Sequence, residues 1–124
     1  MDVGELLLKK HIDEPMLIFL KNNLNTFEKL DIVRFFGLNS SSRVDAETLA
    51  EITNGKIEEI SKAINELVKT HIVDEINIEG KKLYEFSNNK KTLELVKRFI
   101  RYYNNNSIRM LIIGHLLNKG KEVK

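Results

Sequence analysis

Residues 56–86 read KIEEISKAINELVKTHIVDEINIEGKKLYEF, and within this segment the spacing of the apolar side chains changes. In the first half they recur every three or four residues, which is the spacing of a helix that buries one face. The apolar residues with this spacing are Ile57, Ile60, Ile64, Leu67 and Val68. We therefore predict a helix over about residues 57–70.

The second half of the segment has the pattern of a β-hairpin. Apolar and charged residues mix over residues 72–78, as in a strand with one face buried. Glu79 and Gly80, followed by two lysines, supply the turn, because glycine readily adopts the φ angles that tight hairpins need. Residues 83–86 then form the returning strand.

Two further helices are predicted upstream of this segment. Asp45 is an N-cap candidate for a helix that ends at the Asn-Gly pair of residues 54–55. Before it, Asn25 and Glu28 have the spacing of a capping box. The helix that they begin is expected to end at Gly37.

Both ends of the chain carry additional helical signals. Asp13, followed by glutamate and proline, is typical of a helix start. The apolar residues 16–20 that follow favour a short helix, although so few residues also fit a strand. Near the other end, a long helix is expected after Asn89, and Ser107 is expected to cap a final helix through Leu117.

Three helices followed by a two-stranded hairpin is the order of elements in a winged helix-turn-helix domain. A chain of 124 residues fits one domain with a single core. We therefore expect a mainly α protein with a small β-hairpin, an α+β fold, as a single domain over residues 1–124. The winged-helix core is expected at residues 27–87, with flanking helices in residues 1–24 and 90–118 as candidate dimerisation elements.

Several short motifs resemble winged helix-turn-helix transcriptional regulators of the MarR and ArsR kind from bacteria and archaea. Residues 48–51, Thr-Leu-Ala-Glu, resemble the family's second helix, and residues 79–84 resemble its wing. In the predicted third helix and the turn after it, the matching residues are Ile60, Ser61, Lys62, Ile64, Leu67, Ile72 and Val73. Two features depart from the family pattern. His71 stands where the family usually has glycine in a left-handed turn, and Glu58 and Glu59 stand where many DNA readers carry polar or basic groups.

The resemblance implies a DNA-binding transcriptional regulator. In such a domain the third helix enters the major groove of duplex DNA, and the wing contacts the backbone. Lys62 and Asn65 would then contact base edges, Ser61 would contact a phosphate, and the wing lysines would grip the backbone. The full set of candidate nucleic-acid contacts is Arg43, Ser61, Lys62, Asn65, Lys69, Lys81 and Lys82. For each of them, an ordinary solvated surface is the competing explanation.

The charge of the chain is unevenly distributed. Residues 1–79 hold nine Lys and Arg against 15 Asp and Glu, whereas residues 80–124 hold 11 against three. The acidic first part favours a second hypothesis, in which the winged helix binds a protein partner and no nucleic acid. In the basic part, one run of side chains is either additional DNA-binding surface or the solvated face of a packed helix. This run is Lys90, Lys91, Lys97, Arg98 and Arg101.

Apolar residues surround nearly the whole of the final helix, and the N-terminal segment is similarly apolar. A helix that is apolar on all sides must be buried on all sides, and a chain this short has little interior to enclose one. We therefore expect a homodimer in which the terminal helices pack across a two-fold axis. The alternative is a monomer whose terminal helices cover one another. The expected interface residues are Leu7, Phe19, Phe99, Tyr103, Leu111, Ile112 and Leu116.

Several functional classes find no support in the sequence. The chain has no Cys, which excludes disulfides and thiol catalysis and fits a reducing cytoplasm. No apolar run approaches the roughly 20 residues that span a bilayer, so we expect a soluble cytoplasmic protein with no membrane partner. The histidines at 11, 71 and 115 lack metal-ligand spacing, and no catalytic or cofactor-binding motif is found. We therefore expect no metal, no cofactor and no catalytic residue.

Overall fold

The computed structural model describes residues 3–122, with side chains described for residues 3–118. Seven helices and three strands lie within this part of the chain, which confirms the expected α+β class, mainly helical with a small antiparallel sheet. The helices are α1 (Val3–Lys9), α2 (Glu14–Asn23), α3 (Phe27–Leu38), α4 (Ala46–Thr53), α5 (Ile57–Lys69), α6 (Lys90–Tyr103) and α7 (Asn106–Glu122). The strands are β1 (Arg43–Val44), β2 (Val73–Ile78) and β3 (Lys81–Phe86).

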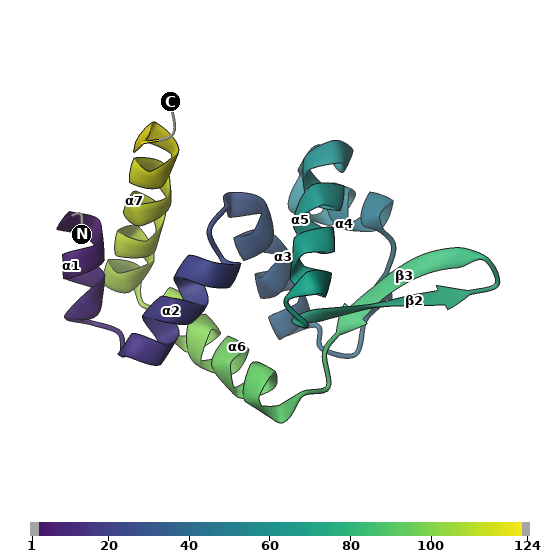
Figure 1. The fold of residues 1–124 in the computed structure, drawn as a ribbon, viewed down its shortest axis with the longest axis horizontal. Helices are drawn as coiled ribbons and strands as arrows, with labels where there is room; N and C mark the ends of the chain where they lie inside the picture. The colour runs from purple at the N-terminus through teal and green to yellow at the C-terminus, as the bar shows by residue number, and fades with distance from the viewer. Residues whose placement is uncertain (1–2, 123–124) are drawn as a thin grey trace.

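The sheet is antiparallel with the strand order β1-β3-β2. β2 and β3 form a hairpin that extends away from the helices (Figure 1). Its two-residue turn has φ angles of 53° at Glu79 and 80° at Gly80. Positive φ at both positions is the geometry of a type I′ turn, whose twist matches that of the strands it joins. β1 is not among the predicted elements, because two residues are too few to show an alternating pattern.

Two aspartates cap helices at the positions predicted from the sequence. Asp13 Oδ1 accepts a hydrogen bond from the backbone N–H of Met16 at 3.0 Å, and α2 begins immediately after it. Asp45 Oδ1 accepts from the backbone N–H of Thr48 at 2.7 Å, at the start of α4. The apolar residues 16–20 are therefore helical, and the strand alternative is wrong.

Two other predicted caps are displaced by one or two residues. Thr26, and not Asn25, caps α3, because its Oγ1 accepts from the backbone N–H three residues further on at 3.2 Å. Asn105, and not Ser107, makes the same contact at the start of α7, at 3.0 Å. In both places adjacent residues are good N-caps, so local preference does not decide which one is used.

Gly37 does not end α3, contrary to the prediction, since the helix continues to Leu38. The glycine instead permits a close approach between helices. A Cβ atom at this position would lie 3.0 Å from Val96 Cγ1 and 3.2 Å from Ile100 Cγ1 on α6. The missing side chain therefore lets α6 pack tightly against α3.

One hydrophobic core runs through the molecule, with α3 near its centre. This helix packs against α4, α5, α6 and β3. Its inward side chains Ile32, Val33 and Phe36 are completely buried. Phe36 also stacks on Phe86 of β3, with the ring centroids 6.4 Å apart. The position of α5 relative to the hairpin is therefore fixed by the helix that both elements contact.

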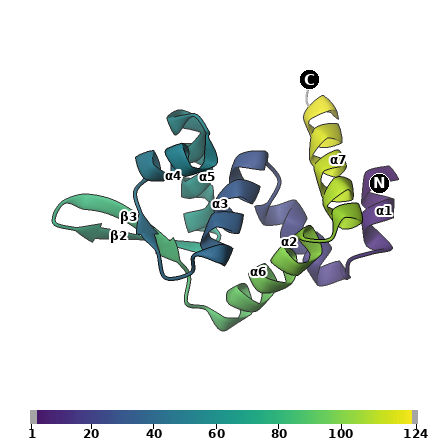
Figure 2. The same cartoon turned by 180° about the vertical axis from the view of Figure 1, so that it is seen from behind.

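α1 and α7 lie side by side at the end of the molecule opposite the hairpin (Figures 1 and 2). Within the single chain α7 is not buried on all sides, because Met110 and Leu117 are 65% and 53% exposed. Of the expected interface residues, Leu7 is exposed and Leu111 is half-buried. The other five are buried within the single chain, namely Phe19, Phe99, Tyr103, Ile112 and Leu116.

Candidate nucleic-acid interface

α5 presents a polar outer face. The 3.6-residue period of the helix places its inward and outward side chains on opposite sides. The exposed glutamates of the first turn lie where the helix dipole favours negative charge. The buried side chains are Ile60, Ala63, Ile64 and Leu67. The exposed ones on the opposite side are Glu58, Lys62, Asn65 and Lys69.

A groove of about 440 Å³ separates α5 from the hairpin. The start of α4 and the first turns of α5 form one wall, and the tip of the hairpin forms the other. Three of the predicted contact residues, Ser61, Lys81 and Lys82, line this groove together. Asp45 and Glu47 line it as well, so the groove carries charges of both signs.

Each of the three predicted DNA-binding cations on the sheet already has a carboxylate partner. Lys81 Nζ lies 3.4 Å from Asp45 Oδ2, and Lys82 Nζ lies 3.8 Å from Glu75 Oε1. These pairs are arranged by the fold, because Lys81 and Asp45 are brought together only when the hairpin lies against the start of α4. Arg43 Nε of β1 donates to Glu85 Oε2 of β3 at 2.9 Å, across paired strands.

The electrostatics of the groove shift the pKa values of two of its residues. The hydrogen bonds from Thr48, with a smaller effect of Lys81, hold the pKa of Asp45 below its ordinary value. Asp45 is therefore a carboxylate at neutral pH. Burial raises the pKa of Tyr84, and Glu75 adds to the effect. Tyr84 is therefore a neutral phenol at neutral pH.

The structure separates Lys62 from this groove. Lys62 lines a different hollow of about 270 Å³ between α5 and the start of α3, where Glu28, Glu59 and Glu66 are its neighbours. Asn65 and Lys69 are exposed further along the outer face of α5. Six of the predicted contact residues thus fall into a groove group and an outer-face group, and the seventh, Arg43, lies on β1.

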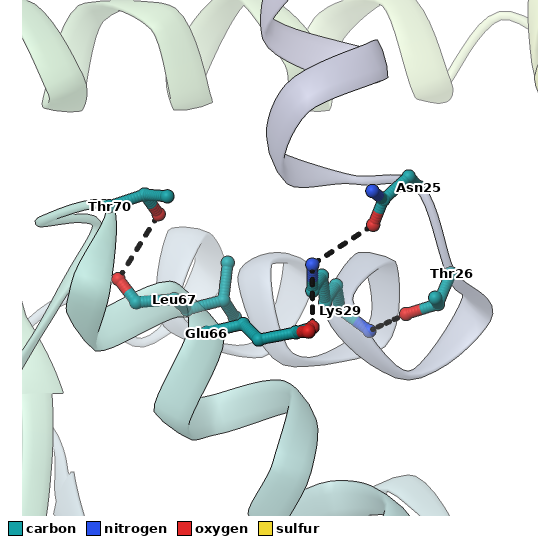
Figure 3. A network of polar contacts seen from close by, with 6 residues as sticks. All are labelled: Asn25, Thr26, Lys29, Glu66, Leu67 and Thr70. Carbon is teal, nitrogen blue, oxygen red and sulfur yellow. Dashed lines mark hydrogen bonds and ion pairs between the residues drawn. The ribbon is translucent and has the colours of Figure 1, made fainter.

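A buried lysine that the sequence analysis does not identify fixes α5 against α3. Lys29 Nζ donates to Asn25 Oδ1 at 3.0 Å and forms an ion pair with Glu66 Oε2 at 2.8 Å (Figure 3). The Lys29 side chain is only 8% exposed. The sequence does contain a signal for it, since Lys29 shares a helical face with the buried Ile32 and Phe36. A charged residue on an apolar face needs a partner.

The basic run of α6 does not adjoin the groove. α6 follows the end of β3 and runs towards α1 and α7, away from the tip of the hairpin (Figure 1). Arg98 forms an ion pair with Asp13 at the start of α2. The remaining members of the run are exposed, namely Lys90, Lys91, Lys97 and Arg101.

The described residues contain neither of two other kinds of functional feature, a metal site and a membrane-spanning helix. Within them, no group of three or more His, Asp or Glu side chains is arranged to hold a metal ion. Across the same residues, no helix combines the length and the apolar character needed to cross a membrane.

Comparison with known proteins adds no assignment, because no protein-family model, curated protein or solved structure matches the chain.

Proposed function

We propose that this chain is a winged helix-turn-helix protein that binds duplex DNA as a cytoplasmic transcriptional regulator of the kind its sequence resembles. The single observation that carries the proposal is the order α3-β1-α4-α5-β2-β3, with the sheet order β1-β3-β2 and an open groove between α5 and the hairpin. That order supports α5 as the helix in the major groove and the hairpin as the wing on the backbone.

The two groups of side chains would have different roles on DNA. Ser61, Lys81 and Lys82 in the groove, together with Arg43 of β1, would contact phosphates, which position the protein without reading sequence. Asn65 on the outer face of α5 would read a base edge, because its amide matches the donor and acceptor pattern of adenine. Lys62 and Lys69 on that face would contact guanine or phosphate.

The carboxylate partners weaken this binding but do not prevent it. An ion pair between exposed side chains contributes roughly 0–1 kcal/mol, so a phosphate can displace the carboxylate at small cost. Lys81 and Lys82 remain 68% and 56% exposed. Both ammonium groups are therefore reachable from outside the molecule.

The proposal is tested by fluorescence anisotropy of labelled random-sequence duplex DNA at several salt concentrations. We expect binding that weakens steeply with salt, because phosphate contacts release counterions. Replacing Lys81 and Lys82 by Gln should lower the affinity for all sequences and reduce the salt slope by about 2. Gln is preferred to Glu because a new carboxylate would face Asp45 and Glu75.

The matched control replaces Lys90 and Lys91 by Gln. Both residues are exposed at the start of α6, which runs away from the tip of the hairpin. Equal losses of affinity in the two double variants would show that only net charge matters, and would remove the wing from the binding site.

A second candidate function is supported by the acidic surroundings of the groove. Exposed carboxylates lie on α4, α5 and the hairpin, among the candidate DNA-binding cations. Such a surface could also bind a basic protein partner. The absence of DNA binding even at low salt would favour this function. The exposed acidic side chains are Glu47, Glu51, Glu58, Glu59, Asp74, Glu75 and Glu79.

We further propose that the protein acts as a homodimer through the outer faces of α1 and α7. Met110, Ile113 and Leu117 recur at three- and four-residue spacing on the side of α7 that the chain itself leaves open. Gly114 lies between them, and a Cβ there would meet no other atom within 4 Å. These three side chains form an apolar stripe on α7. A second copy of α7 could approach closely at Gly114 and cover this stripe with its own identical stripe.

A further inference from the structure

A separate hollow of about 290 Å³ lies in the corner between the end of α6 and the start of α7. The corner where α6 meets α7 lies closer to α1 than to the hairpin (Figures 1 and 2). The volume of the hollow is near the lower limit of small-molecule pockets, which begin at about 300 Å³. Its described lining residues are Arg98, Arg101, Tyr102, Asn105 and Ile108.

The lining is positively charged. Two guanidinium groups contribute to it, and none of its described lining residues is acidic. Arg98 is partly neutralised by its ion pair with Asp13. Arg101 forms no ion pair with any side chain of residues 3–118. The hollow therefore holds one guanidinium whose charge the described side chains leave unbalanced.

Neighbouring arginines outside the hollow are used differently. The Arg34 guanidinium lies over the ring of Tyr103, at 4.9 Å from its centroid. Arg109 donates to the Tyr103 carbonyl oxygen at 3.2 Å and also to Asn106. Their interactions within the chain account for their positions, whereas no such contact with a side chain of residues 3–118 accounts for Arg101.

The other lining residues contribute a hydrogen-bond donor and apolar surface to the hollow. Asn105 uses its Oδ1 to accept a hydrogen bond from the backbone N–H of Ile108 at 3.0 Å, so its NH₂ group remains available as a donor. The start of the long helix α7 adds the positive end of a helix dipole. The Tyr102 ring and the Ile108 side chain supply apolar surface.

We propose that this hollow binds a small organic anion, in which a carboxylate or a phosphate is attached to a flat apolar group. Arg101 would hold the anionic oxygens with its planar fork of donors, and Asn105 would add a further hydrogen bond. The Tyr102 ring would contact the flat group. The site rests on the α6–α7 corner alone and does not depend on the proposal that the protein binds DNA.

The site can be tested on the full chain by nuclear magnetic resonance titration of the backbone amides with four probes. Benzoate and phenyl phosphate carry both parts of the proposed ligand. Inorganic phosphate lacks the flat group, and benzamide lacks the charge. We expect saturable shifts at the α6–α7 corner with benzoate or phenyl phosphate, and weaker binding of the other two by about tenfold or more. Tighter binding of benzoate would identify the anionic group of the ligand as a carboxylate, and tighter binding of phenyl phosphate would identify it as a phosphate.

The Arg101→Gln variant should bind the tighter of the two anionic probes about tenfold or more weakly, since a hydrogen bond to a charged group is lost. Lys91→Gln is the matched control, because it removes one exposed positive charge at the other end of the same helix. Arg101 is exposed, so the variant is expected to remain folded. Equal effects of the two variants, equal binding of benzamide or inorganic phosphate, or no saturable shift up to millimolar concentrations would each overturn the proposal.

Discussion

His71 follows α5 with a φ angle of 64°, in the left-handed region. The resembling family usually has glycine in a left-handed turn at this position, and the histidine adopts the same conformation. The left-handed region costs an ordinary residue roughly 1–2 kcal/mol relative to glycine. Replacing such a residue by glycine removes this cost, but the greater freedom of glycine in the unfolded chain offsets part of the stabilisation.

His71→Gly should therefore raise the free energy of unfolding by roughly 0.5–1 kcal/mol, measured by urea denaturation. The His71 side chain is exposed, so little packing is lost. Asn54→Gly serves as the control, because Asn54 has a φ angle of 56° and asparagine tolerates this region. A destabilised His71→Gly would show that the histidine side chain makes a contact that outweighs the backbone strain.

The ion pair between Lys29 and Glu66 makes the free energy of unfolding depend on pH in the acid range. The hydrogen bond from Lys29 is the main reason that the pKa of Glu66 lies below its ordinary value of 4.5. A lowered pKa in the folded state means that the stabilisation is complete above the unfolded value. It is lost as the pH falls through the lower, folded value.

Glu66→Gln should lower the free energy of unfolding at pH 7 by about 1 kcal/mol. The effect is smaller than for a fully buried pair, because the Glu66 side chain is 42% exposed and solvent screens it. The difference from the wild type should shrink below pH 4.5 and vanish once Glu66 is protonated in the folded protein. Glu59→Gln, an exposed change on the same helix, should have little effect at any pH. A difference that does not change with pH would contradict this account.

At the scale of the elements, the start of α4 and the tip of the hairpin are linked through Asp45. One carboxylate oxygen caps α4 through Thr48, and the other lies 3.4 Å from Lys81. Asn is as good an N-cap as Asp, so Asp45→Asn keeps the helix start and removes the charge that competes for Lys81.

If the hairpin binds DNA, Asp45→Asn should raise the affinity for duplex DNA about two- to five-fold at low salt, because an exposed ion pair of up to about 1 kcal/mol no longer competes. Glu14→Gln removes an exposed carboxylate from α2 and controls for net charge. Anisotropy titrations of both variants give the comparison. Equal affinities for the two variants would place Lys81 outside the DNA contact.

At the scale of the whole molecule, the unpaired apolar stripe on α7 predicts the oligomeric state. Sedimentation equilibrium should show a dimer for the wild type, and Met110→Glu with Leu117→Glu should give a folded monomer, because both side chains are more than half exposed. Leu38→Glu changes a 63% exposed leucine at the end of α3 and should remain a dimer. A monomeric wild type would contradict the proposed interface and favour terminal helices that cover only one another.

The sequence by itself determines the helices, the hairpin and several of their ends, because these depend on interactions within a few residues. The spacing of apolar residues over 56–86 predicts α5, β2 and β3, and Asp13 and Asp45 predict two helix starts that the structure confirms. The type I′ turn at Glu79 and Gly80 is also a local property.

Only the tertiary structure decides what depends on residues far apart in the chain. In the sequence Gly37 stands where a helix could end, and only the packing of α6 against α3 shows that it permits a close approach of the two helices. The same holds for the Lys29–Glu66 pair, for the carboxylates beside the hairpin lysines, and for the hollow around Arg101. Helical and strand periods arise from the local backbone, whereas neighbours across the core or a groove are set by how whole elements pack.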